Sequence, residues 1–83
     1  MLSIGDLIQV NDLEMGWTYL LVDGGEHATL RFKMLPVTNK EVGIILSLDP
    51  HEFLKGEENY FLVCFGSNVG YLPDDRFIVL QQH

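Results

Sequence analysis

The chain has 83 residues, of which 47 % are hydrophobic, and twelve acidic against five Lys and Arg side chains give it a formal net charge of −7. This length excludes two domains, because two half-sized cores could not offset the entropy of ordering the chain, so residues 1–83 are expected to form a single domain. The apolar content excludes disorder, and the negative charge argues against a protein that binds nucleic acid or an anionic membrane through phosphate contacts.

Apolar and polar side chains alternate with a period of two in several segments, which is the pattern of a sheet with one buried face. Helical spacing is not sustained anywhere in the sequence. The predicted strands are, in chain order, residues 4–10, 17–22, 28–34, 42–48, 60–65, 69–72 and 77–80.

Two of these segments show the alternation most clearly, and their more apolar side is predicted to face the core. The predicted inward-facing residues are Ala28, Leu30, Phe32 and Met34 in the first segment, and Val42, Ile44, Leu46 and Leu48 in the second. Segment 60–65 is apolar on both faces and rich in aromatic and β-branched residues, so it is predicted to be central and covered on both sides.

Glycine and asparagine mark the turns between the segments, because these residues adopt positive φ at little cost. Asp23-Gly24-Gly25-Glu26 predicts a hairpin over residues 17–34, and Gly66-Ser67-Asn68 predicts a second, tight hairpin. Several short strands at close spacing favour a small barrel rather than a sandwich, and closure of the barrel would hide the sheet edges.

The stretch Val69-Gly70-Tyr71-Leu72-Pro73-Asp74-Asp75-Arg76-Phe77-Ile78-Val79 resembles the end of an SH3 domain, where a strand leads through a 3₁₀ turn into the last strand. Ile4-Gly5-Asp6-Leu7-Ile8 and Val42-Gly43-Ile44-Ile45-Leu46 resemble the first and second strands of SH3-like and KOW-type barrels. The resemblance implies an all-β fold, namely an SH3-like five-stranded barrel with the hairpin of residues 17–34 inserted between the first and second barrel strands. The same segments are also similar to short uncharacterised proteins of T4-like tailed phages.

The sequence departs from signalling SH3 domains at the positions that bind proline-rich ligands. It has no early Ala-Leu-Tyr-Asp-Tyr motif, Trp17 lies too early to be the mid-chain tryptophan, and the stretch after Pro73 is one residue longer before Phe77. We therefore expect the fold to carry over without proline-rich peptide binding. The usual partner of KOW-type barrels is RNA or RNA polymerase, and the acidic composition weakens the RNA part of that analogy.

No pattern predicts catalysis, a metal or a cofactor. The three histidines lack ligand spacing, and Asp49, His51 and Glu52 are interpreted as a solvated turn rather than a metal site. Cys64 lies in the most apolar segment and is interpreted as a small core residue rather than a nucleophile. Nucleophile-elbow, phosphate-loop and zinc-protease motifs are absent, so the protein is not expected to be an enzyme.

Aromatic residues that a small barrel cannot all bury are the candidate partner-binding residues, because aromatic anchors are enriched at protein interfaces. They are Trp17, Tyr19, Phe53 and Tyr71. The expected partner is another protein of a host or a virion, with a homodimer as a variant. The lone Cys64 and the absence of a leader pattern in residues 1–6 predict a cytoplasmic protein without a signal peptide or membrane span.

Three functional hypotheses remain open on the sequence. The first is a non-enzymatic phage accessory or host-interaction protein that docks through the inserted hairpin. The second is a minor structural component of the virion. The third is an acidic inhibitor that imitates nucleic acid in the groove of a DNA- or RNA-binding host protein, and it requires the carboxylates to gather on one face.

Overall fold

The computed structural model describes residues 2–25, 32–49, 54 and 59–83. The described residues form an all-β structure without an α-helix, as the alternation predicts, and a short 3₁₀ turn precedes the last strand. Its elements are β1 (Leu7–Val10), β2 (Trp17–Asp23), β3 (Phe32–Thr38), β4 (Val42–Ser47), β5 (Tyr60–Phe65), β6 (Asn68–Pro73), η2 (Asp74–Arg76) and β7 (Phe77–Gln81). No helix among these residues is long and apolar enough to span a membrane.

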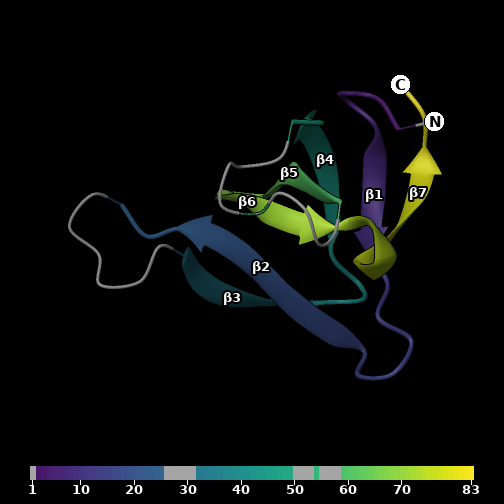
Figure 1. Ribbon diagram of the computed structural model, residues 1–83. Coiled ribbons are helices and arrows are strands. Elements are labelled where there is room, and N and C mark those ends of the chain that lie inside the picture. Colours follow the sequence, from purple (N-terminus) through teal and green to yellow (C-terminus); the bar gives the residue numbers. More distant parts are fainter. Residues whose placement is uncertain (1, 26–31, 50–53, 55–58) are drawn as a thin grey trace.

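All seven strands belong to one antiparallel sheet with the order β3-β2-β6-β5-β4-β1-β7 (Figure 1). The sheet curls but is not closed, because β3 and β7 end the order and do not pair with each other in the described part of the chain. Two edges therefore remain where barrel closure was expected to leave none. The predicted central position of β5 is confirmed, since this strand lies between β4 and β6 near the middle of the sheet.

The predicted hairpin exists and is longer than the sequence suggests. Strand β2 pairs with β3 from Trp17 opposite Thr38 to Asp23 opposite Phe32, so the hairpin continues past the expected end at Met34. Residues 26–31, which include the predicted inward positions Ala28 and Leu30, lie outside the described residues. The hairpin extends as an arm beside the other five strands, and β2 joins them at a single register pair, Leu21 opposite Tyr71 of β6 (Figure 1).

One face of the sheet, here called the inner face, carries the whole buried apolar core of the described residues. The core consists of Ile8, Val10, Leu20, Val37, Ile45, Val63, Phe65, Leu72 and Phe77. The strand register confirms that these residues share one face, because Ile45 lies opposite Val63 and Val10 lies opposite Phe77. The opposite face is called the outer face.

The predicted facing of β4 is wrong. Its apolar series Val42, Ile44 and Leu46 is exposed on the outer face, whereas Gly43 and Ile45 lie inside, and Leu48 beyond the strand is also exposed rather than buried in the core. The inward position 43 requires a glycine, because the inner surface is crowded there and a Cβ atom would lie 2.8 Å from a ring carbon of Phe65. A glycine in the inward series lowers its apolar count, and the alternation is therefore misread from the sequence.

The predicted inward face of residues 28–34 is also corrected in its described part. Met34 is 61 % exposed and Phe32 is only half-buried, whereas Val37 is buried and Leu35 packs against the core. The strand continues to Thr38, and its inner series is formed by residues that the shorter predicted segment did not include. For β5, Val63 and Phe65 are buried while Leu62 and Cys64 are half-buried, so only one face of this strand is fully covered.

Candidate functional site

The β2–β3 hairpin places a group of aromatic and other apolar side chains on the outer face of the sheet. Trp17, Tyr19 and Leu21 alternate along β2 and therefore share this face, while Leu20 between them is fully buried on the other. Their cross-strand partners in β3 are Thr38, Pro36 and Met34, respectively. Directly opposite residues of an antiparallel pair lie on the same side of the sheet, so Pro36 and Met34 extend the group across both strands.

Ring contacts hold the aromatic side chains in defined positions. The rings of Trp17 and Tyr19 meet edge to face with their centroids 4.8 Å apart. Phe32 and Tyr71 make a second edge-to-face pair at 6.3 Å, which links the far end of the hairpin to β6. We call the set formed by Trp17, Tyr19, Leu21, Phe32, Met34, Pro36 and Tyr71 the hairpin patch.

The hairpin patch is open to solvent in spite of these contacts. Tyr19 is 42 % exposed and Met34 is 61 % exposed, while Trp17 and Tyr71 are half-buried. Large apolar side chains that are partly exposed and fixed by ring contacts lose little conformational entropy when a partner covers them. The patch therefore has the properties of a preformed binding surface.

A polar network at the base of the hairpin fixes its direction. The Asp12 carboxylate, in the β1–β2 turn, accepts hydrogen bonds from the backbone N–H groups of Glu14 and Met15 at 3.0 and 2.9 Å and from Arg76 Nη1 at 2.9 Å. The Asn39 side chain accepts from the Asp12 N–H at 2.8 Å and donates to the Asp12 carbonyl at 3.0 Å. These contacts connect the start of β2, the end of β3 and η2, and they therefore hold the base of the hairpin in place against the rest of the sheet.

Asp12 functions as a charged anchor in this network. It is buried, and its pKa lies below the ordinary value of 3.8 because of the hydrogen bond from the Met15 N–H, with the Glu14 N–H and the Arg76 guanidinium acting in the same direction against the cost of burial. The carboxylate is therefore charged at neutral pH and balanced by Arg76. Its partners are all structural, and we assign it to the fold rather than to chemistry.

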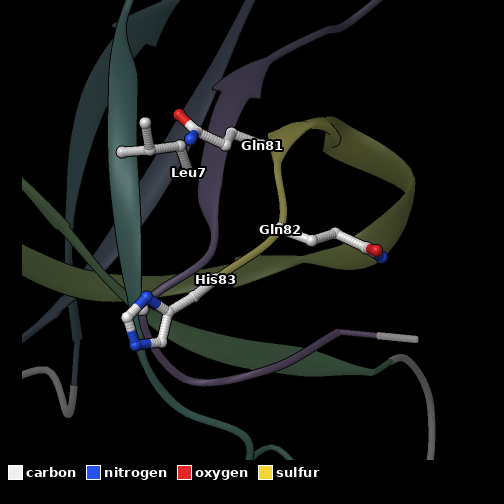
Figure 2. A pocket seen from close by; sticks show the side chains of 5 residues that line it. Leu7, Gln81, Gln82 and His83 are labelled. Carbon is white, nitrogen blue, oxygen red and sulfur yellow. The ribbon is translucent and has the colours of Figure 1, made fainter.

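A second buried carboxylate, Asp6, joins two distant segments near the other end of the sheet. It accepts hydrogen bonds from the N–H groups of Ser3 at 2.8 Å and His83 at 2.7 Å. The His83 contact, followed by that of Ser3, lowers the pKa of Asp6 below 3.8 against the opposing effect of burial. A shallow hollow of about 300 Å³ lies beside these residues, lined by Gly5, Leu7, Gln81, Gln82 and His83 (Figure 2). Its side chains are two neutral amides, one leucine and one imidazole, and they include no carboxylate, thiol or hydroxyl.

Three of the four predicted partner-binding residues come together. Trp17, Tyr19 and Tyr71 all belong to the hairpin patch, whereas Phe53 lies outside the described residues, as do His51 and Glu52 of the predicted solvated turn. The predicted binding residues do not include Met34, which is predicted to face the core, or Pro36, which lies beyond the predicted strand. The cross-strand register of the hairpin would have found both, because they lie opposite Leu21 and Tyr19.

The interpretation of Cys64 as a core residue is wrong. Cys64 is half-buried on the outer face of β5, and its thiol donates to the Gly66 carbonyl oxygen at 3.2 Å. The described residues contain no group of three His, Cys, Asp or Glu side chains that could bind a metal ion. The apolar and aromatic outer surface is therefore the strongest candidate for function in the part of the molecule that the structure describes.

Comparison with known proteins adds no family to this picture. No protein-family model matches the chain, and neither a curated protein nor a solved structure matches it. The function must therefore be inferred from the residues of the chain itself.

Proposed function

We propose that this protein is a non-enzymatic protein-binding module with an SH3-like arrangement, in which β1, β4, β5, β6 and β7 form the barrel and β2–β3 is the inserted hairpin. The one-turn η2 between Pro73 and Phe77 supports this arrangement, because the resembling segment of SH3 domains also passes through a 3₁₀ turn before its last strand. The position of the hairpin in the chain, after β1 and before β4, supports it as well.

The observation that carries the proposal is the hairpin patch. Tryptophan and tyrosine are enriched among the residues that dominate binding energy at protein interfaces, and such residues cluster with other apolar groups. Trp17 and Tyr19 meet this description because they are in ring contact and partly exposed, and Pro36 lies opposite Tyr19. The patch lies on the outer face and leaves the barrel core unchanged when a partner docks.

The charge of the chain indicates what kind of protein surface the hairpin patch binds. The net charge is −7, and the exposed carboxylates of Asp23 and Glu41 flank the patch near its two ends. Lys33 lies opposite Val22, so it is on the other face of the hairpin. A basic protein segment fits this surface, because an Arg or Lys side chain can stack on an aromatic ring while carboxylates attract it.

We propose a phage accessory protein acting on a host protein in the host cytoplasm as the biological setting, on the basis of the resemblance to proteins of T4-like phages. The hypothesis of nucleic-acid imitation has less support. Asp6 and Asp12 are buried and bonded to the backbone, so two of the twelve carboxylates do not contribute to an acidic surface.

The test is affinity capture from lysates of phage-infected bacteria with three forms of the tagged protein: wild type, Tyr19→Ala and Leu13→Ala. Leu13 is 89 % exposed and lies outside the patch, so its substitution is the matched control. We expect the Tyr19→Ala variant to lose its partner by about tenfold or more and the control to retain it. Higher salt should weaken the complex because its attraction is partly ionic.

Equal capture by all three forms, with circular dichroism showing that each is folded, would refute the assignment of the hairpin patch. Mass spectrometry of purified virions separates the two phage roles. A host-directed protein is absent from the particles, and a structural component is present in them.

A further inference from the structure

The five strands outside the hairpin contain no charged residue at all. Their sequences are LIQV, VGIILS, YFLVCF, NVGYLP and FIVLQ, for β1, β4, β5, β6 and β7. A sheet with one face in water normally alternates apolar and polar residues. Of the seventeen charged side chains in the sequence, those among the described residues all lie outside these five strands.

The strand register arranges the exposed residues of these strands in a continuous apolar row. Val69 of β6 lies opposite Cys64 of β5, Cys64 lies opposite Ile44 of β4, and Ile44 lies opposite Leu7 of β1. The row therefore crosses four neighbouring strands on the outer face, with Ile44 near its centre.

Other apolar side chains on the same face flank the row. We call the whole set the β4 face; it consists of Leu7, Val42, Ile44, Leu46, Leu62, Cys64, Val69 and Ile78. Val42, Ile44, Leu46, Val69 and Ile78 are each more than two-fifths exposed. Four of these five are β-branched and therefore rigid, so they lose little side-chain entropy on docking.

The exposed area of the β4 face reaches the range of weak, specific dimers. With full side-chain areas on the order of 150–200 Å², the partly exposed members together leave roughly 500 Å² of apolar surface open. Two such faces in contact would bury about 1,000 Å² in total, which is the lower limit of a biological interface.

We propose that the β4 face packs against the β4 face of a second copy of this chain. A partner attracted by charge would dock where the carboxylates are, and the β4 face has none. A second copy supplies an equally uncharged apolar surface, and two sheets can pack face to face about 10 Å apart with their side chains interdigitated. The hairpin patch is formed by other residues and adjoins the β4 face where Tyr71 lies opposite Leu62.

The opposite salt response distinguishes this dimer from the complex proposed for the hairpin patch. Two chains of net charge −7 repel each other, and salt screens this repulsion within about 10 Å at 0.1 M. The dimer is therefore stronger in high salt. The dimer is expected to be weak, because an interface of about 1,000 Å² is at the lower limit of biological interfaces.

The test is analytical ultracentrifugation of the full chain across micromolar to millimolar concentrations, at low and high salt, with wild type, Ile44→Lys and Leu13→Lys. Both substitutions add the same charge at an exposed leucine or isoleucine. We expect the wild type and Leu13→Lys to double in mass with concentration, more readily in high salt, and Ile44→Lys to remain monomeric. A monomeric wild type at millimolar concentration in high salt overturns the proposal, as does a dimer that Ile44→Lys leaves intact.

Alkylation of the native Cys64 gives a second readout that requires no substitution. Cys64 lies within the β4 face, so its reaction rate should fall with rising protein concentration as the dimer forms. A rate that is the same in dilute and concentrated samples overturns the proposal. This measurement also decides the question if Ile44→Lys proves to be unfolded by circular dichroism.

Discussion

Adjacent isoleucines in β4 provide a direct test of which side of the sheet is the core. Ile45 is fully buried at 0 % exposure, whereas its neighbour Ile44 is 43 % exposed on the outer face. The substitutions Ile45→Ala and Ile44→Ala remove the same atoms from the same strand. A difference in stability between the two variants therefore shows which side chain faces the core, because the change in β propensity is the same for both.

The expected magnitudes differ by several-fold. Removing a fully buried isoleucine side chain costs about 2–5 kcal/mol, and the position of Ile45 within the core cluster places it near the middle of that range. An exposed substitution usually changes the free energy of unfolding by no more than about 0.5 kcal/mol. The melting temperature of a domain of this size falls by about 4–8 °C per kcal/mol, so Ile45→Ala should lower it by roughly 15–25 °C.

Urea unfolding followed by Trp17 fluorescence and far-ultraviolet circular dichroism measures both variants. The samples must be dilute enough to be monomeric, because dimer formation would stabilise the folded state of the wild type. Equal losses for Ile44→Ala and Ile45→Ala would show that β4 does not have the facing described, and the β4 face would then not exist. A larger loss for Ile44→Ala would restore the facing predicted from the sequence alternation.

Three further predictions concern the contacts that position the hairpin and the termini. Gly70→Ala should destabilise the fold by about 1–3 kcal/mol, because the new Cβ would lie 2.7 Å from a backbone oxygen of β2. Gly25→Ala is the control, since no atom lies within 4 Å of its new Cβ, and its smaller cost should come from the positive φ of Gly25 alone. Asp12→Ala should lower the melting temperature and speed amide exchange in the hairpin, and an unchanged exchange pattern would contradict its anchoring role. Folding lowers the pKa values of Asp6 and Asp12, so the stability that these two carboxylates contribute is present above pH 3.8 and is lost as the pH falls below that value. Melting temperatures measured from pH 7 to pH 2 should show this loss of stability. The loss should be smaller in a variant that carries Asp6→Asn and Asp12→Asn.

The sequence predicts the strands well because period-two alternation and glycine-containing turns are local signals. Six of the seven predicted segments overlap an observed strand over most of their length, and the hairpin starts at Trp17 as expected. The end of β3 is missed because Pro36 suggests that a strand stops there. In this sheet β3 is an edge strand, where a proline without a backbone N–H is tolerated.

The anchoring carboxylates could not be identified from the sequence. Asp12 is paired with Asn39 and Arg76, which are 27 and 64 residues away, and Asp6 is paired with His83 at a separation of 77. The alternation pattern contains no information about such distant contacts. Both residues therefore looked like ordinary members of a solubilising surface.

Facing is the part of the fold in which local sequence is ambiguous, and β4 shows why. Residues 42–46 read Val-Gly-Ile-Ile-Leu, and the outward series Val42, Ile44 and Leu46 is more apolar than the inward pair Gly43 and Ile45. The register shifts after Ile45, so that Ser47 lies opposite Leu62. The inward glycine is required by close packing against Phe65, a contact between strands that no local pattern reveals. The excess of apolar residues on the outside then needs its own explanation. Val42 and Ile44 keep more than two-fifths of their surface open in the monomer, and a partner surface that covers them is the physical reason we infer for their presence.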